Sequence, residues 1–208
     1  MFSAIQQFLA LQGTKYISPA KAGDLSETML AYKALGQEAR QEFTRLAQQF
    51  QTLYPNLSLQ KVSNWMNQAQ VLRPYFWVYL QGVGELSEPM FALRLYGDEA
   101  DFGISVEVSV IERKKDEESL SKQNRVLTVP VADGMYYFAQ IDGVSQRFSG
   151  NEDNRQLLLG QVASGQVRKV LVKQDINCSQ ATSVEGIVQK MQATLENLIP
   201  YYEATREI

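Results

Sequence analysis

The spacing of apolar residues changes along the chain, and each spacing predicts a different kind of element. In the first 70 residues the spacing is that of one face of a helix. It is clearest at Phe43, Leu46, Ala47, Phe50 and Tyr54. Pro55 is expected to end this helix and Ser58 to cap a second one, whose apolar positions are Val62, Trp65, Met66 and Ala69. Residues 1–72 should therefore be mainly helical.

From residue 74 onward apolar and polar positions alternate, and this period of two predicts strands. The expected strands are 75–81, 90–97, 103–112, 125–131, 134–141, 144–148 and 167–176, with Asp133-Gly134 and Asp142-Gly143 as turn signals. One helix, 154–164, is inserted before the last strand and ends at Gly165. A final helix, 183–205, begins where Thr182 and Glu185 have the spacing of a capping box.

Together these elements predict an α+β fold, in which a mostly antiparallel sheet lies between an N-terminal helical region and a C-terminal helix packed on it. The helical region is expected over 1–72, the sheet with one inserted helix over 73–182, and the last helix over 183–205. A chain of 208 residues can bury a full core without disulfides or metal ions. We therefore expect a single domain over residues 1–208.

Histidine is absent from the chain, and cysteine occurs once, as Cys178. Without histidine, Ser-His-Asp and Cys-His catalysis and histidine-held zinc are excluded. A single cysteine rules out an internal disulfide and suits a reducing cytosol. No apolar run reaches the roughly 20 residues of a membrane-spanning helix, and the N-terminus lacks the pattern of a secretory signal. We expect a cytoplasmic protein with no cofactor, metal site or membrane contact, and a binding role is favoured over an enzymatic one.

Two motifs point toward enzymes. The stretch "GQVASGQVRK" (160–169) has glycines at P-loop spacing, but it lacks the Lys and Ser/Thr that must follow them, so we reject it. Glu112 and Lys114 form the E-x-K element of Mg²⁺-dependent nucleases, and in a hairpin only Glu88 would lie opposite. The favoured alternative is a charged strand end that runs into a solvated "RKKDEES" loop. A nuclease that uses Glu88, Glu112 and Lys114 is therefore the third interpretation of this chain.

The stretch "LRPYFWVYLQG" (72–82) places Tyr75, Trp77 and Tyr79 on one face of a strand. With 82–88 as the connection, Tyr75 is expected opposite or near Leu95, and Tyr79 near Phe91. The face shared with Tyr75 would then also carry Trp77, Tyr79, Phe91, Leu93 and Leu95. Buried core is the favoured reading for most of this face. Tyr75 and Leu95 lie toward one end of the hairpin, where a pocket would suit a flipped base, because stacking contributes about 1–3 kcal/mol per base.

The order of motifs resembles the N-terminal DNA-recognition domains of modification-dependent restriction GTPases, which flip out a methylated cytosine. The similar segments are "LRPYFWVYLQG", "MFALRLYGDEADFGIS", "ASGQVRKVLVKQDINCSQ" and "VEGIVQKMQATLENLIPYY". The resemblance implies base-binding roles for Tyr75, Phe91 and Leu95. A further pocket aromatic of the family falls near Asn67, where Trp65 or Met66 is the nearest substitute. The similar segments contain no GTPase, so the resemblance also implies a separate effector or motor subunit.

The leading hypothesis is a non-catalytic intracellular recognition domain of a restriction system. It would bind double-stranded DNA and extrude a base, in particular a modified one, into a pocket formed by Tyr75, Phe91, Leu95 and Trp65. Phosphate contacts would come from Arg73, Arg113, Lys114, Lys115 and Lys122. The net charge of −3 counts against a dedicated nucleic-acid binder. The alternative is therefore a protein- or small-ligand-binding module that uses the same pocket without nucleic acid.

Overall fold

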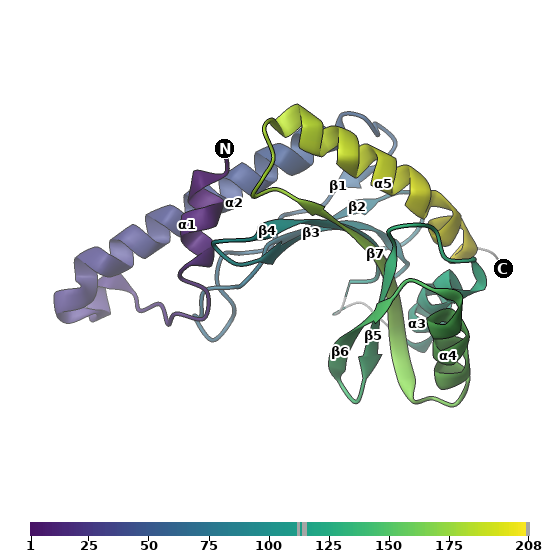
Figure 1. Cartoon of the computed structure of the whole chain (residues 1–208). Helices are drawn as coiled ribbons and strands as arrows, with labels where there is room; N and C mark the ends of the chain where they lie inside the picture. Colours follow the sequence, from purple (N-terminus) through teal and green to yellow (C-terminus); the bar gives the residue numbers. More distant parts are fainter. Residues whose placement is uncertain (112, 114–115, 207–208) are drawn as a thin grey trace.

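The computed structural model describes all residues except 112, 114–115 and 207–208 (Figure 1). In the described chain the helices are α1 (Ser3–Leu9), α2 (Ser26–Gln51), α3 (Glu117–Asn124), α4 (Glu152–Ala163) and α5 (Val184–Ala204), with 3₁₀ turns η1 (Pro19–Lys21), η2 (Gly23–Leu25) and η3 (Arg125–Thr128). The strands are β1 (Ser58–Leu59), β2 (Trp77–Gln81), β3 (Met90–Gly97), β4 (Phe102–Ser109), β5 (Tyr136–Ile141), β6 (Val144–Ser149) and β7 (Val167–Asn177). The predicted α+β class is confirmed.

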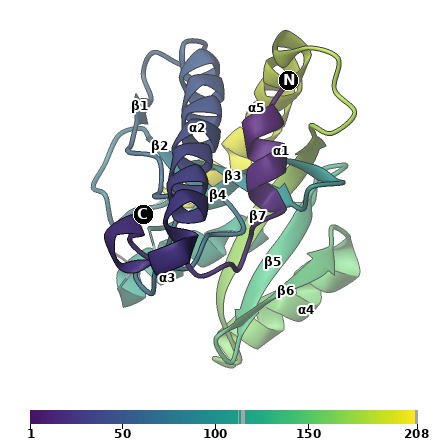
Figure 2. The same ribbon diagram turned by 90° about the vertical axis from the view of Figure 1, so that its left-hand side faces the viewer.

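The described strands form one antiparallel sheet in the order β1-β2-β3-β4-β7-β5-β6. The sheet curves strongly, and its helices gather on the convex side (Figure 1). There α5 runs along the sheet, α3 and α4 continue that layer beside β7, and α2 packs against both α1 and α5 (Figure 2). The concave side is left as an open hollow beneath the arch, and the site described below lies in it.

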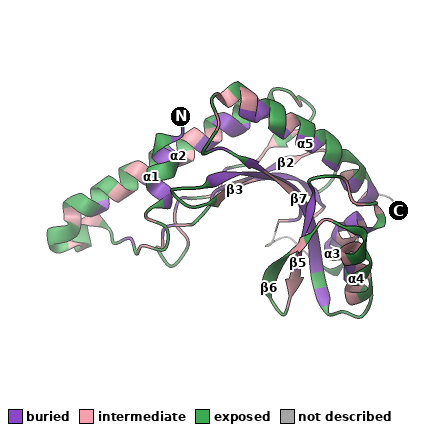
Figure 3. Ribbon diagram, viewed as in Figure 1, coloured by how far each residue is buried: buried purple, intermediate pink, exposed green. Residues whose placement is uncertain are grey.

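The two faces of the sheet differ sharply in chemistry. The convex face is apolar and buried, and from residue 76 to the end of β4 it includes Phe76, Val78, Leu80, Phe91, Leu93, Leu95, Ile104, Val106 and Val108. Figure 3 shows the strands beneath the helices as mainly buried, whereas β6 is mostly exposed. The concave face carries Tyr75, Trp77, Tyr79, Arg94, Ser105, Glu107 and Ser109 in the same part of the sheet. Burial of the apolar face provides the main driving force for this fold.

The predicted register of the β2–β3 hairpin is wrong by one residue. Tyr79 pairs with Ala92 and Leu80 with Phe91, so Phe91 and Leu95 lie on the convex face, opposite to Tyr75. A slip of one residue moves every side chain of a strand to the other face. The expected register would have put Arg94 into the apolar core, where an unpaired charge is very costly. The observed register places Arg94 beside a buried carboxylate on the concave face.

Two other predicted elements are wrong. Residues 58–72 do not form a helix, because Ser58–Leu59 is strand β1 and the following loop instead packs Trp65 against α2. A Cβ at Gly36 of α2 would lie only 2.8 Å from the Trp65 ring, so this contact depends on glycine. The expected strand 125–131 is the 3₁₀ turn η3 followed by an irregular segment.

The sheet region therefore contains two inserted α-helices rather than one. Helix α3 occupies part of the stretch expected to be a solvated loop, and Asp116 and Ser119 form a capping box at its start. Helix α4 is the one predicted. The last helix begins after Ser183, whose hydroxyl accepts a hydrogen bond from the Gly186 amide, so Thr182 is not its cap.

Candidate functional site

The four residues predicted to form a base-binding pocket do not line a common pocket. Tyr75 lies on the concave face, and 38% of its surface is exposed. Phe91 is in the core, where its ring centre lies 4.6 Å from that of Tyr202 in α5. Leu95 borders the concave cavity, but strand alternation turns its side chain into the core. Trp65 is buried against Tyr16 in the N-terminal region. Tyr75 alone faces the hollow.

A cavity of about 610 Å³ occupies the concave face of the sheet. One wall consists of Tyr75, Tyr79, Arg94 and Tyr96, and the opposite wall of Tyr136, Phe138 and Arg147. Its floor is the concave face of β7, which contributes Lys169, Leu171, Lys173 and Asp175. This volume lies within the range of small-ligand sites, roughly 300–1,000 Å³. The cavity thus combines aromatic walls with a charged floor.

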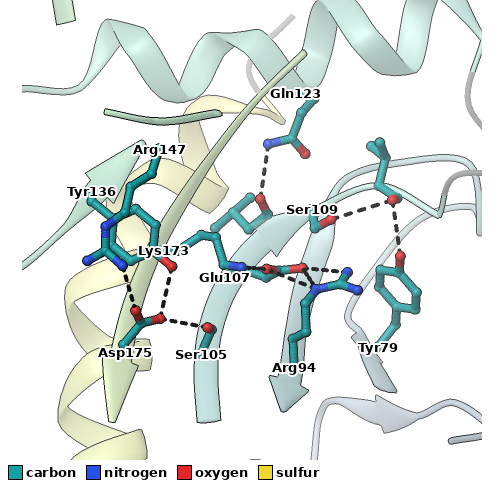
Figure 4. Close-up of polar contacts among 12 residues, drawn as sticks. Tyr79, Arg94, Ser105, Glu107, Ser109, Gln123, Tyr136, Arg147, Lys173 and Asp175 are labelled. Carbon is teal, nitrogen blue, oxygen red and sulfur yellow. Dashed lines mark hydrogen bonds and ion pairs between the residues drawn. The ribbon is translucent and has the colours of Figure 1, made fainter. Parts of the chain in front are cut away.

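A buried ion triad lies in the floor of this cavity (Figure 4). Glu107 is fully buried, and its carboxylate lies 2.9 Å from Arg94 NH2 and 2.9 Å from Lys173 Nζ. Burial alone would raise the pKa of Glu107, but Arg94 and Lys173 outweigh burial and lower it to about 2. Two cations share one carboxylate, so the triad carries a positive charge at neutral pH.

A second polar cluster is centred on Asp175 (Figure 4). Its carboxylate accepts hydrogen bonds from Ser105 Oγ at 2.6 Å, Tyr136 Oη at 2.9 Å and Arg147 NH1 at 3.0 Å. The guanidinium of Arg147 lies 3.6 Å from the centre of the Tyr136 ring. Burial raises the pKa of Tyr136, and the charge of Asp175 raises it further, so this hydroxyl remains a donor at neutral pH. Asp175 thereby joins β7 to β4, β5 and β6.

Aromatic rings and guanidinium groups alternate at the β2 wall. The ring centres of Tyr75 and Trp77 are 5.8 Å apart, and Arg94 lies 5.6 Å from each of them. The guanidinium of Arg73, in the segment that leads into β2, lies 4.6 Å from the centre of the Trp77 ring. Such cation–π contacts contribute about 0.5–2 kcal/mol each. They hold the rings in place, and the exposed ring of Tyr75 offers a platform on which a planar group can stack.

The predicted phosphate contacts and the nuclease triad are not assembled at this cavity. Lys122 pairs with Glu88 and Glu118 instead, each at 2.9 Å. Arg73 packs on Trp77, and Arg113 is exposed. Glu112, Lys114 and Lys115 lie outside the described residues. In the part of the chain that is described, no group of three or more acidic or cysteine side chains is placed to hold a metal ion.

No protein-family model matches this chain, and a search of curated proteins finds no significant match. Among the described helices, none combines the length and the apolar character needed to cross a membrane. The resemblance to restriction GTPases therefore remains a prediction, and any assignment of function depends on the concave cavity.

Sequence reasoning missed the residues that give the cavity its chemistry, namely Arg94, Glu107, Arg147, Lys173 and Asp175. Three of the strands that contain these residues, β3, β4 and β7, do have a sequence pattern that indicates them. In "FALRLY", "SVEVSV" and "VLVKQDI" a charged residue interrupts an otherwise apolar run. A charge in such a strand is buried only when it is paired. Charges of opposite sign in neighbouring strands therefore indicate ion pairs between those strands.

Lys169 gives a prediction that depends on pH. Its side chain is buried at the cavity floor. Burial lowers its pKa from 10.5 to about 8, with Arg94 adding to this effect and Glu107 opposing it. Between these two values the unfolded chain binds a proton that the folded protein has lost, so the folded state gains stability as pH rises. Between pH 8 and pH 10.5 the free energy of unfolding should rise by up to about 3 kcal/mol from this residue, and Lys169→Met should abolish that rise.

The measurement is chemical denaturation of both proteins at several pH values. Tyrosine ionisation at high pH contributes to both proteins and cancels in their difference, and replacement of the exposed Lys190 by Met controls for loss of a lysine. Between pH 8 and pH 10.5 wild type should gain stability relative to Lys169→Met. Parallel stability curves for wild type and variant would contradict the assignment.

Proposed function

We propose that this chain is a non-catalytic DNA-recognition domain whose concave cavity accepts an extruded base. The observation that carries the proposal is the meeting of aromatic rings and surplus cations in one cavity, although the chain as a whole has a net charge of −3. The ion pairs at this cavity contain three cationic side chains, Arg94, Arg147 and Lys173. They contain two carboxylates, Glu107 and Asp175. A nucleotide needs both a surface for stacking and positive charge for its phosphate.

The base is expected to stack on Tyr75. This ring is exposed at the cavity wall, and Arg94 and Trp77 hold it from behind. Stacking of a base on an aromatic side chain contributes about 1–3 kcal/mol, whatever the base. Tyr136 in the opposite wall and Asp175 in the floor offer hydrogen-bonding groups for the edge of the base. Enzymes and readers that extrude a base use the same combination of stacking and edge contacts.

The phosphate backbone is expected to pass over Arg147. This residue lies on the edge strand β6, and 60% of its side chain is exposed. Its NH1 group donates to Asp175, and a guanidinium has four further N–H donors for phosphate oxygens. Because β6 is the last strand of the sheet, Arg147 lies at the rim of the cavity rather than at its floor. A duplex can reach it without entering the cavity.

A second candidate function is the binding of a small anionic ligand without nucleic acid. The positive charge of the ion triad is at the floor, where Lys173 is almost fully buried. A flipped base is neutral and leaves its phosphates at the rim, so it does not use this charge directly. A compact ligand with a carboxylate or phosphate group would reach it. Such a ligand should bind as a free small molecule as tightly as it would as part of a nucleic acid.

Arg147→Ala tests the proposed function, and Arg168→Ala is its matched control. Arg168 has similar exposure, 57% against 60%, and also has a carboxylate partner, but that partner is Glu117 of α3, in the helix layer on the convex side. Binding of labelled duplexes is measured by fluorescence anisotropy over a salt series. Arg147→Ala should weaken binding and reduce the salt slope by about one. Arg168→Ala should change neither quantity.

A duplex with one central mismatch provides the test for base extrusion. A mismatched base costs less to unpair, so the mismatched duplex should bind more tightly than the matched one. Equal effects of the two arginine substitutions would contradict the placement of DNA at the concave face. Binding of a mononucleotide or inorganic phosphate by a protein that shows no affinity for duplexes would favour the second candidate.

A further inference from the structure

We propose that the concave cavity is a two-jawed clamp, hinged within β7 and held by a latch at Asp175. The first jaw is the β1–β4 part of the sheet with the helices packed on it. The second jaw is β5 and β6 with the first half of β7 and α4. The ligand expected to move the jaws is the DNA of the proposed function, but the hinge and the latch are properties of the free protein and are tested there.

Strand pairing places the hinge at two residues. β7 pairs with β4 from Val172 to Asn177, and with β5 from Val167 to Lys173. Among the strand pairs that the structure describes, only Val172 and Lys173 are therefore paired on both sides. One half of β7 is hydrogen-bonded to β4 and the other half to β5. The two sets of strand hydrogen bonds overlap over two residues of β7. A change in twist at this point would move one jaw against the other.

Where β4 and β7 separate, their backbone groups form hydrogen bonds with side chains of α3 instead of with a neighbouring strand. Gln123 Nε2 donates to the Val108 carbonyl at 3.0 Å and to the Val170 carbonyl at 2.9 Å. Asn124 accepts from the Val170 amide at 2.8 Å and donates to the Arg168 carbonyl at 3.1 Å. These bonds satisfy buried backbone groups without a fixed ladder. Because these side chains can rotate, they can keep their hydrogen bonds when the gap between β4 and β7 widens or narrows.

Asp175 is the latch because it bonds to both jaws at once. Ser105 belongs to β4 in the first jaw, whereas Tyr136 and Arg147 belong to β5 and β6 in the second. The cavity is bordered by both jaws, with Tyr75 and Arg94 on one side and Tyr136 and Arg147 on the other. An anionic ligand that binds the remaining N–H donors of Arg147 draws the guanidinium toward the rim and so weakens its bond to Asp175. Filling the cavity is thereby coupled to the spacing of the jaws.

Spin labels at two exposed valines measure this spacing. Val83, in the β2–β3 connection, is 81% exposed, and Val144, at the start of β6, is 62% exposed. Both are replaced by cysteine in a Cys178→Ala background, and distances are measured by double electron–electron resonance. Asp175→Asn should broaden or shift the distance distribution of the free protein. Asp153→Asn, an exposed carboxylate at the start of α4, should leave it unchanged.

The outcomes separate the clamp from the proposed function. A broadened distribution in Asp175→Asn supports the clamp even if no duplex binds, in which case the proposed function fails. A duplex that binds without shifting the distances, together with an unchanged Asp175→Asn distribution, overturns the clamp and leaves the proposed function standing. If Asp175→Asn does not fold, Tyr136→Phe removes one of the two bonds by which Asp175, in the half of β7 paired with β4, reaches the second jaw. An unchanged distribution in that variant also overturns the clamp.

Discussion

Glu107→Ala should lower the free energy of unfolding by about 3–5 kcal/mol, which is the usual cost of breaking a buried ion pair by removing one partner. Glu107 is fully buried, and it is the carboxylate shared by Arg94 and Lys173. Its removal leaves two cations close together at the floor of the cavity without their counterion. Most of the expected cost comes from the unpaired charge left in a buried site rather than from the lost attraction itself.

Denaturant unfolding of matched variants isolates this cause. Glu203→Ala, an exposed carboxylate of α5, should change stability by no more than about 0.5 kcal/mol. Replacing all three members of the triad, as Arg94→Met, Glu107→Leu and Lys173→Met, should recover most of the loss, because the whole ion cluster is then absent. If the triple variant were no more stable than Glu107→Ala, the cost would come from lost packing rather than from charge.

Acid titration gives an independent check on the same residue. The pKa of Glu107 is lowered from 4.5 to about 2, so its stabilising contribution is complete above pH 4.5 and is lost as pH falls toward 2. Wild type should therefore lose part of its stability in this range, in addition to the losses from its other carboxylates. Glu107→Ala lacks this component, and the stability difference between the two proteins should narrow as the pH falls.

The fold class could be predicted because periodicity alone indicates it. The apolar face of α2, the strand β3 and the helix α5 follow their patterns closely, and each lies near the expected residues. The loop around Trp65 has apolar residues at helical spacing, but Trp65 packs against α2 from an irregular segment and Ala69 is exposed. Helix α3 was missed because its sequence is polar, and its start depends on the Asp116 cap rather than on an apolar face.

The candidate site was predicted only in part, and the register of one hairpin explains why. Alternation correctly grouped Tyr75, Trp77 and Tyr79, but it cannot by itself say which face of β3 they meet. The position of Arg94 decides that question, since a charged residue within an apolar strand must share its face of the sheet with a partner. Glu107 in the next strand is that partner. Placing Arg94 on the same face as Glu107, away from the apolar face, would have assigned Phe91 and Leu95 to the convex face.

Phe91→Ala should destabilise the protein by about 3–5 kcal/mol, the usual range for truncating a buried aromatic residue. Phe91 is only 3% exposed, and its ring packs against Tyr202 of α5 on the convex face. The same substitution should leave the duplex affinity of the folded molecules unchanged, because Phe91 does not line the concave cavity. Thermal and denaturant unfolding give the first quantity, and anisotropy below the melting transition gives the second.

Tyr75→Ala is the matched substitution on the other face of the same hairpin, and the opposite result is expected. Tyr75 is 38% exposed, so its removal costs little packing, whereas loss of its stacking surface should weaken duplex binding by about 1–3 kcal/mol. The pair of variants therefore separates a core aromatic from a binding aromatic in one experiment. If Phe91→Ala left stability intact but abolished binding, a base pocket on the Phe91 side of β3 would have to replace the concave cavity as the site.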